Sequence, residues 1–234
     1  MNSVVTNDIR RSNATSSPNS IGIALCVALV VLAASAMASV WFALPAAWAD
    51  ASTLIARTTV RTLRDGTGPR YNPRQWESLS AQLQEGLATA PGNAQLHDDL
   101  GYLHAVRSLR MGNVPIGSSE RALQNEWMDT AIQHYRTACA LRPTFPYTWA
   151  YLALAKHYRG QYDDEFWAAF DHSLQYGHRE AALHGVMVEA AFAAWPKLGP
   201  RRQLAIATII NSAKAPLKTR FTAMARRANI QLPG

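Results

Sequence analysis

The chain has 234 residues, of which 23 are Lys or Arg and 16 are Asp or Glu, so its formal net charge is +7. With 48% hydrophobic residues, this balance excludes an acidic, disordered chain and suffices to bury the core of one soluble domain of ordinary size. The 2 cysteines exclude a disulfide framework and a cysteine-ligated zinc site, because both need more cysteines or a series of Cys and His ligands.

The first fifty residues predict a membrane anchor. Residues 12–49 contain no charged side chain, and residues 21–42 among them are nearly all apolar. As a helix with about 1.5 Å of rise per residue, this apolar stretch reaches about 33 Å, which is enough to cross the core of a bilayer. We therefore expect a disordered cytoplasmic tail over residues 1–20 and a transmembrane helix over residues 21–43.

The charged residues that flank this stretch predict its orientation. Arg10 and Arg11 precede it and Asp50 follows it, so the positive-inside rule places the N-terminus in the cytoplasm. We expect the bacterial inner membrane, with the rest of the chain in the periplasm. A cleaved signal peptide is the alternative, since residues 47–49 (AWA) form a small-x-small site. The long apolar stretch and the long segment before it favour a retained anchor.

Residues 44–72 are expected to form a juxtamembrane helix and a linker. Pro45 suits the first turn of a new helix, on which Arg57, Arg61 and Arg64 would share one face. That face would contact either phospholipid headgroups or solvent. Residues 66–73 (GTGPRYNP) contain two glycines and two prolines, which predicts a break between elements.

Residues 73–234 are expected to form an all-α domain. No segment after the break shows the alternation of a strand, and apolar residues recur at three- and four-residue spacing. Prolines and glycines divide this pattern into helices that we expect to pair in antiparallel fashion. The dividing residues are Pro91, Gly92, Pro143, Pro146, Gly160, Pro196, Pro200 and Pro216.

Two segments match a helix-turn-helix repeat of about 34 residues. The first is carried by Leu100, Gly101, Ala131, Tyr135, Ala138 and Pro143, and the second by Trp149, Leu152, Ala153 and Gly160. Over roughly residues 78–176 the sequence resembles the tetratricopeptide repeat (TPR) family, which implies a short α-solenoid. It departs from the family at His97, which occupies the first aromatic position, and at residues 111–119, which indicate an inserted loop.

The resemblance implies a groove that binds a peptide or a helix of a protein partner. Carried over residue by residue, the family's groove positions are Gln95, Asp98, Tyr102, Tyr147, Leu154 and His157. The alternative is a shallow surface that the chain's own termini fill.

The C-terminal segment is basic, because no acidic residue follows Glu189. The candidate anion- or partner-binding residues there are Arg201, Arg202, Lys214, Lys218, Arg220, Arg226 and Arg227. Since the predicted topology places this surface outside the cytoplasm, we expect no nucleic acid as a partner. Phospholipid headgroups, acidic polysaccharide and acidic patches on proteins are the anions expected there. A solvated face that aids solubility is the alternative.

Catalytic and metal-binding patterns are missing from the sequence. His97 and His104 are two helical turns apart and give no zinc ligand set, so we expect neither a metal nor a cofactor. The acidic run at residues 163–165 would suit acid–base chemistry on a glycosidic bond, but its place after Gly160 predicts the start of a helix. No phosphate-binding glycine loop, nucleophile elbow or dinucleotide fingerprint occurs. We therefore expect a protein that is not an enzyme.

Residues 164–178 (DEFWAAFDHSLQYGH) and the helix expected from Pro200 are similar to small membrane-anchored TPR proteins associated with exopolysaccharide biosynthesis and export. This similarity implies a scaffold or regulator that contacts subunits of a polysaccharide polymerase or export complex. Two alternatives stay open. One is a periplasmic assembly factor for cytochrome or secretion machinery that captures client peptides, and the other is a polysaccharide-modifying enzyme that uses residues 163–165.

Overall fold

The structure is a computed structural model that describes residues 18–67 and 72–233. Every regular element over these residues is a helix, which confirms the expected all-α class. The chain divides into two compact units, Met1–Pro45 and Ala46–Gly234, which we describe separately. Residues 18–20, the end of the predicted tail over residues 1–20, are helical, so the prediction is wrong there. Residues 1–17 of that tail, with Arg10 and Arg11, lie outside the described ranges, as does part of the predicted linker.

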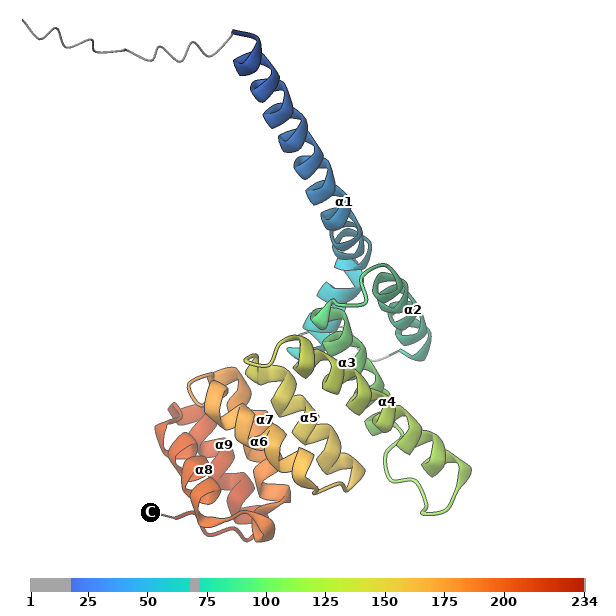
Figure 1. Cartoon of the computed structure of the whole chain (residues 1–234). Helices are drawn as coiled ribbons and strands as arrows, with labels where there is room; N and C mark the ends of the chain where they lie inside the picture. The colour runs from blue at the N-terminus through green and yellow to red at the C-terminus, as the bar shows by residue number, and fades with distance from the viewer. Residues whose placement is uncertain (1–17, 68–71, 234) are drawn as a thin grey trace, which may run out of the picture. The chain divides into compact units, whose positions relative to one another are not determined.

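The first unit contains the apolar part of helix α1, which runs from Pro18 to Arg64 (Figure 1). From Leu25 to Pro45 every side chain of this helix is exposed. Within the described ranges, α1 is the one helix long and apolar enough to cross a membrane. Its composition and length therefore fit the predicted anchor, although a signal sequence near an N-terminus would meet the same criteria. The orientation across a membrane stays a prediction.

Helix α1 continues through Pro45, so the expectation that a new helix starts there is wrong. A proline inside a helix removes one backbone hydrogen bond and costs about 3 kcal/mol, but the turns on either side keep their own bonds. The helix instead ends at Arg64, just before the predicted break.

The second unit begins with the last turns of α1 and continues through eight more α-helices and one 3₁₀ turn over the described residues. These are α2 (Pro73–Thr89), α3 (Ala94–Arg110), α4 (Ser119–Leu141), α5 (Pro146–Arg159), α6 (Asp164–Gly177), α7 (Ala181–Ala193), η1 (Trp195–Lys197), α8 (Pro200–Ser212) and α9 (Ala215–Arg227). The predicted breaks fall between them: Pro146 opens α5, Pro200 opens α8, and Gly160 ends α5 with a φ of 77°. The expected inserted loop separates α3 from α4.

Within the second unit, the end of α1 packs through a stripe of small side chains. Ala49, Thr53, Ala56 and Val60 follow one another at three- and four-residue spacing and are fully buried. The chains approach closely here, because a Cβ added at Gly86 of α2 would lie 2.4 Å from Cγ2 of Thr53. Ala56 and Val60 of this stripe form a hydrophobic cluster with leucines of α2 and α3.

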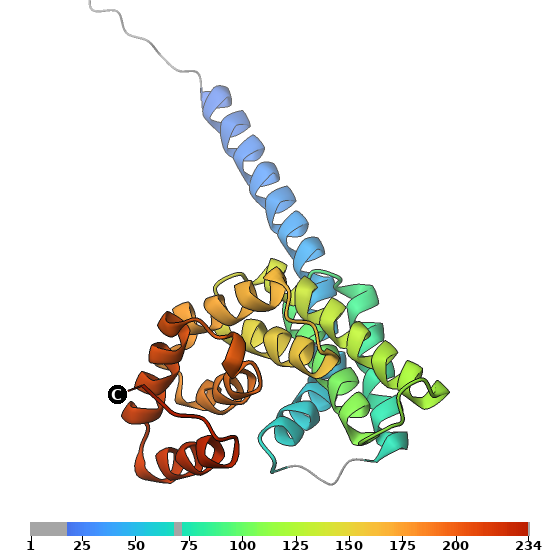
Figure 2. The ribbon, with the colours of Figure 1, turned by 90° about the horizontal axis from the view of Figure 1, so that it is seen from below.

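A second, larger cluster joins α4 to α9, with Tyr135, Phe166 and Phe170 among its largest buried side chains. Helices α3 and α4 pack against each other, as do α5 and α6, and α5 also packs on α7 (Figure 2). A Cβ added at Gly101 of α3 would lie 2.8 Å from the ring of Tyr135 on α4. Gly101 therefore lets α3 and α4 approach closely.

Candidate functional site

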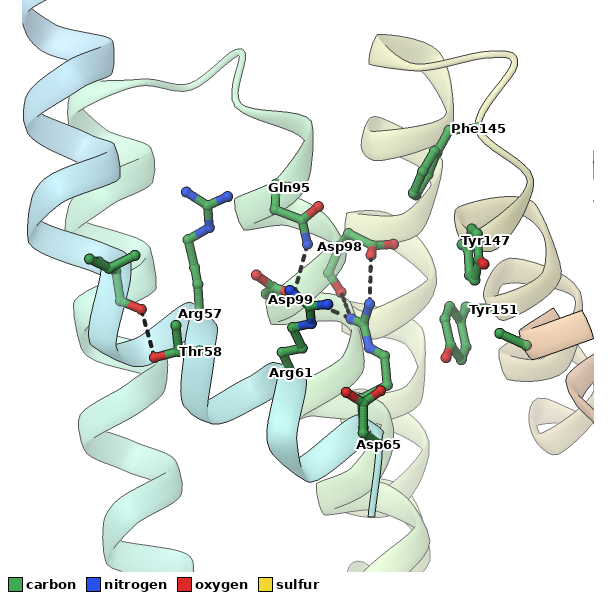
Figure 3. Close-up of a pocket in the computed structure, with 13 residues that line it drawn as sticks. Arg57, Thr58, Arg61, Asp65, Gln95, Asp98, Asp99, Phe145, Tyr147 and Tyr151 are labelled. Carbon is green, nitrogen blue, oxygen red and sulfur yellow. Dashed lines mark hydrogen bonds and ion pairs between the residues drawn. The ribbon is translucent and has the colours of Figure 1, made fainter. Parts of the chain in front are cut away.

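A groove with a volume of about 810 Å³ lies in the second unit, between the end of α1, α3 and α5 (Figure 3). Its wall mixes charged and aromatic side chains. The residues that line it are Leu54, Arg57, Thr58, Arg61, Arg64, Asp65, Gln95, Asp98, Asp99, Phe145, Tyr147, Tyr151 and Ala182. We call it the α1/α3/α5 groove.

Arg64, in the last turn of α1, joins this helix to α3. Its Nη1 lies 3.1 Å from Oδ2 of Asp98 and its Nη2 lies 3.3 Å from Oδ1 of Asp99. The two carboxylates are only 1% and 4% exposed, so a single guanidinium compensates two buried acids. Buried charges persist only when they are paired and hydrogen-bonded, and Arg64 is therefore a fixed part of the fold.

Polar side chains complete this network. Thr148 of α5 donates its hydroxyl to Oδ1 of Asp98 at 3.0 Å, and Gln95 donates its amide to Oδ1 of Asp99 at 3.0 Å. Arg142 in turn donates to Oε1 of Gln95 at 3.3 Å. Hydrogen bonds from α1 and α5 thus converge on neighbouring acids of α3, and this holds the three walls of the groove in register.

Aromatic rings surround the arginine. The guanidinium carbon of Arg64 lies 4.9 Å from the ring centroid of Tyr102 and 5.0 Å from that of Tyr151, within the range of cation–π attraction. Tyr147 lies one turn before Tyr151, at the start of α5, and its hydroxyl donates to Oε2 of Glu180 at 3.2 Å. In Figure 3, Tyr147 and Tyr151 face the polar side chains of α3 across the groove.

The charges that line the groove balance, since they come from three arginines and three aspartates. Burial raises the pKa of Asp99 to about 6, against the opposing attraction of Arg64. Arg57 is paired with Asp50 at 2.7 Å. Arg61 is exposed and, among the described residues, its side chain has no hydrogen-bond or ion-pair partner. It is therefore the cation of this wall that is free to meet a ligand.

The structure brings together half of the predicted groove residues. Gln95, Asp98 and Tyr147 line the groove, and Tyr102 packs beside Arg64 at its edge. Leu154 and His157 do not line it. They lie further along α5, where Leu154 packs against the larger hydrophobic cluster and Nδ1 of His157 lies 2.7 Å from the hydroxyl of Tyr162.

The prediction missed the α1 side of the groove. Its arginines were assigned to a surface facing headgroups or solvent, whereas Arg57, Arg61 and Arg64 all line the groove. Their shared helical face was a usable signal, and so were the adjacent acids Asp98 and Asp99 on a helix with an apolar stripe. The sequence does not show that residues 34 and 35 positions apart meet.

The predicted basic surface separates into residues with different surroundings. Arg202 forms a two-bond pair with Asp171, at 2.7 Å for each bond, and Lys218 donates to the carbonyl of Asn211 at 3.2 Å. Arg201 and Lys214 line cavities beside α8. The remaining members, all exposed, are Arg220, Arg226 and Arg227.

The acidic run at residues 163–165 starts α6, as predicted. Asp163 caps this helix by accepting a hydrogen bond from the backbone N–H of Phe166 at 3.0 Å. Glu165 accepts two bonds of 2.6 Å from Arg136, and fully buried Lys156 donates to Asp163 and Glu165. Hydrogen bonds from Arg136 lower the pKa of Glu165 against the effect of burial. At neutral pH this carboxyl therefore lacks the proton that a general acid must supply.

Three histidines lie together between α3 and α4. Nδ1 of His97 lies 3.1 Å from Nδ1 of His134, whose ring stacks on that of His104 at a centroid distance of 5.7 Å. Burial lowers the pKa of His104 and of His134 to about 4, so both are neutral at pH 7. Across the described ranges, no group of three or more potential ligand side chains is placed to hold a metal ion.

The comparisons with known proteins complete the description of this site. No family model, no curated protein and no solved structure matches the chain. The resemblance to the TPR family therefore stays a prediction from sequence.

Proposed function

We propose that this protein is a membrane-anchored adaptor whose helical domain holds a segment of a partner protein in the α1/α3/α5 groove. The observation that carries the proposal is the groove itself, a volume of about 810 Å³ whose polar groups are held by a buried network. A groove lined by aromatic rings and a few fixed polar groups is typical of sites that bind a ligand through shape and a small number of hydrogen bonds.

A repeat architecture is part of this proposal. The α3–α4 and α5–α6 helix pairs follow each other along the chain, and the first helices α5 and α7 are in contact. The close approach of Gly101 to Tyr135 has the small-to-aromatic complementarity that the repeat pattern requires. Stacked pairs of this kind present the first helix of each pair to a shared binding surface. We propose a short TPR-like solenoid on these grounds.

The lining also indicates the chemistry of the bound segment. Arg61 lies exposed on the wall and offers hydrogen-bond donors to an acidic side chain or a backbone carbonyl. Opposite it, Tyr147 and Tyr151 offer aromatic faces and hydroxyl groups. A polypeptide segment with an acidic residue beside an apolar one would satisfy both walls.

The pathway in which the adaptor acts is proposed from sequence resemblance alone. We propose exopolysaccharide biosynthesis or export, with polymerase or export subunits as partners, an anchor in the bacterial inner membrane and the domain in the periplasm. A periplasmic assembly factor for cytochrome or secretion machinery is the second candidate, because a peptide-binding groove of this kind suits client capture equally well. Neither candidate requires a cofactor or catalysis.

Site-specific photo-crosslinking in intact cells tests the proposal. A photoreactive phenylalanine analogue replaces Tyr147 on the groove wall in one full-length variant and exposed Glu126 on α4 in the control. We expect a discrete adduct from position 147 and none from position 126. Polymerase or export subunits in that adduct would support the first pathway, and cytochrome or secretion components the second. Equal labelling at both positions, or none at 147, would contradict a partner in the groove.

A charge-reversal pair makes the test specific for the lining. Arg61→Glu changes the free cation of the groove, and Arg74→Glu makes the same change at an exposed arginine of α2 outside it. We expect Arg61→Glu to reduce the adduct at least about fivefold through loss of one charge-assisted contact, and Arg74→Glu to leave it unchanged. Equal effects of the two variants would show that net charge, and not the groove, controls capture.

A further inference from the structure

A second groove in the helical domain lies between α6 and α8. Two cavities, of about 740 Å³ and 680 Å³, share Leu174 of α6 and Ala205 of α8 in their walls, so they lie next to each other along these helices. The ion pair between Asp171 and Arg202 joins the two helices at one end. We call the two adjoining cavities together the α6/α8 groove.

The floor of the α6/α8 groove is apolar along one face of α8. Ala205 and Ile209 lie one turn apart on that face, between Leu174 of α6 and Leu217 of α9. Ala205 is small and half-buried, which leaves room for another chain to approach α8 closely. An apolar helical face of this kind, bordered by a neighbouring helix, is a typical binding site for an amphipathic helix.

The rim of the α6/α8 groove is positively charged at both ends. Arg201 lies at one end, and Arg179 and Lys214 lie at the other. All three side chains are exposed and have no hydrogen-bond or ion-pair partner within the described part of the chain. The acid in the wall, Asp171, is already held by Arg202. The groove therefore has three uncompensated cations around an apolar floor.

We infer that the α6/α8 groove binds an acidic amphipathic helix of a partner protein. Arg201 lies in the first turn of α8 and Lys214 lies just past the end of this 13-residue helix, so the two basic ends are separated by about the length of α8, about 20 Å. A partner helix of about 14 residues spans this length and would place acidic residues over both basic ends. Its apolar stripe would cover Ala205, Ile209 and Leu217. This site lies on other residues than the α1/α3/α5 groove, so the domain would hold two partner segments.

Three synthetic peptides of about 14 residues serve as probes against the full chain in neutral detergent micelles. The first has leucines on one helical face and glutamates at both ends. The second has the same composition with the leucines distributed around the helix, and the third has glutamine in place of glutamate. By fluorescence anisotropy we expect a Kd of about 10 μM for the first peptide and binding at least about tenfold weaker for the other two.

Two triple variants with the same loss of charge locate the site. The groove variant combines Arg179→Gln, Arg201→Gln and Lys214→Gln, and the control variant combines Arg220→Gln, Arg226→Gln and Arg227→Gln on α9. We expect the groove variant to bind the first peptide about tenfold more weakly than the parent protein, and the control variant to bind it less than threefold more weakly.

A steric pair tests the apolar floor independently of charge. Ala205→Gln fills the floor of the α6/α8 groove, and Ala223→Gln makes the same change at an exposed position of α9. We expect only Ala205→Gln to weaken binding of the first peptide, by about tenfold. Both variants should keep the helical circular dichroism spectrum of the parent protein.

Four outcomes would overturn the inference. The first is that the acidic amphipathic peptide does not bind, and the second is that the scrambled peptide binds equally well. The third is that both triple variants weaken binding to the same degree, which would show attraction to a general basic surface. The fourth is that vesicles of anionic phospholipid bind through Arg179, Arg201 and Lys214 while the peptide does not, which would assign the groove to lipid headgroups. The photo-crosslinking result at Tyr147 does not depend on any of these outcomes.

Discussion

The two grooves of the helical domain differ in whether their charged side chains are paired. In the α1/α3/α5 groove, Arg64 and the acids Asp98 and Asp99 compensate one another and are largely buried. In the α6/α8 groove, Arg201 and Lys214 are exposed and have no side-chain partner in the described ranges. Compensated buried charges hold the helices in place, whereas free cations on a rim contribute little to folding and remain available to an anion. The same residue types therefore stabilise the fold in one groove and are available for binding in the other.

Removing the central arginine should give the largest effect. Arg64→Leu leaves Asp98 and Asp99 buried side by side without their cation, and we expect a loss of about 3 kcal/mol in the free energy of unfolding. The matched control is Arg61→Leu, one turn earlier on the same helix, which should change it by less than about 0.5 kcal/mol. Urea unfolding of the full chain, followed by tryptophan fluorescence, measures both. Similar losses for the two variants would show that the buried network is not the source of stability.

The close approach of α1 to α2 should give the next largest effect. Gly86→Ala brings a methyl group against Cγ2 of Thr53, and we expect a loss of about 2 kcal/mol although alanine favours helices. Thr53→Ser removes that methyl and keeps the hydroxyl that donates to the carbonyl of Ala49. The double variant should therefore be more stable than Gly86→Ala alone. If the losses of unfolding free energy in the two single variants simply add in the double variant, the contact between these residues would be contradicted.

Acidification should weaken the domain through its buried histidines. An unfolded histidine binds a proton near pH 6.5, whereas folded His104 and His134 bind one only near pH 4. Between these values the unfolded state holds more protons, so stability is complete above pH 6.5 and falls as the pH is lowered. We expect His104→Phe to remove about 1–2 kcal/mol of the loss between pH 7 and pH 5. Exposed His178→Gln is the control and should leave that loss unchanged.

Asp99 should act in the opposite direction over an overlapping pH range. Its folded pKa of about 6 lies above the usual 3.8, so the folded state holds the extra proton, and the stability this gives is lost as the pH rises through 6. Comparing urea midpoints of Asp99→Asn and His104→Phe at pH 5 and pH 7 separates the two contributions.

The surface pair of the second groove should give the smallest effect. Asp171 and Arg202 have side chains that are 52% and 29% exposed, in contrast to the buried acids of the first groove. We expect Asp171→Asn to lower the free energy of unfolding by about 0.5 kcal/mol or less, and this loss to vanish in high salt. A loss close to that of Arg64→Leu would remove the contrast between the two grooves.

The positions of the helices could be predicted from the sequence because local signals determine them. Pro146 and Pro200 start helices, Gly160 ends one, and Asp163 caps the next, each within its own turn of chain. Pro45 misled the prediction because a proline signals a helix start and an interruption within a helix alike. The outcome depends on whether the chain before it is also helical.

The residues that line the α1/α3/α5 groove could be predicted less completely, because the groove depends on contacts between distant segments. Gln95, Asp98 and Tyr147 were found through a repeat pattern, which preserves the face of each helix. The pattern had no position for α1, whose Arg64 reaches α3 across 34 residues. The α6/α8 groove was missed for a similar reason, since the basic segment showed its charge but not which cations flank an apolar floor.

The buried position of Ala49 has a consequence for how the chain matures. Proteases cut exposed, extended backbone, and Ala49 lies inside α1 with its side chain fully buried against the helical domain. If a signal peptidase acts after this residue, it must do so before the domain folds around it. Folding and processing would then compete in time. A variant that folds more slowly would shift the products from anchored protein towards released protein.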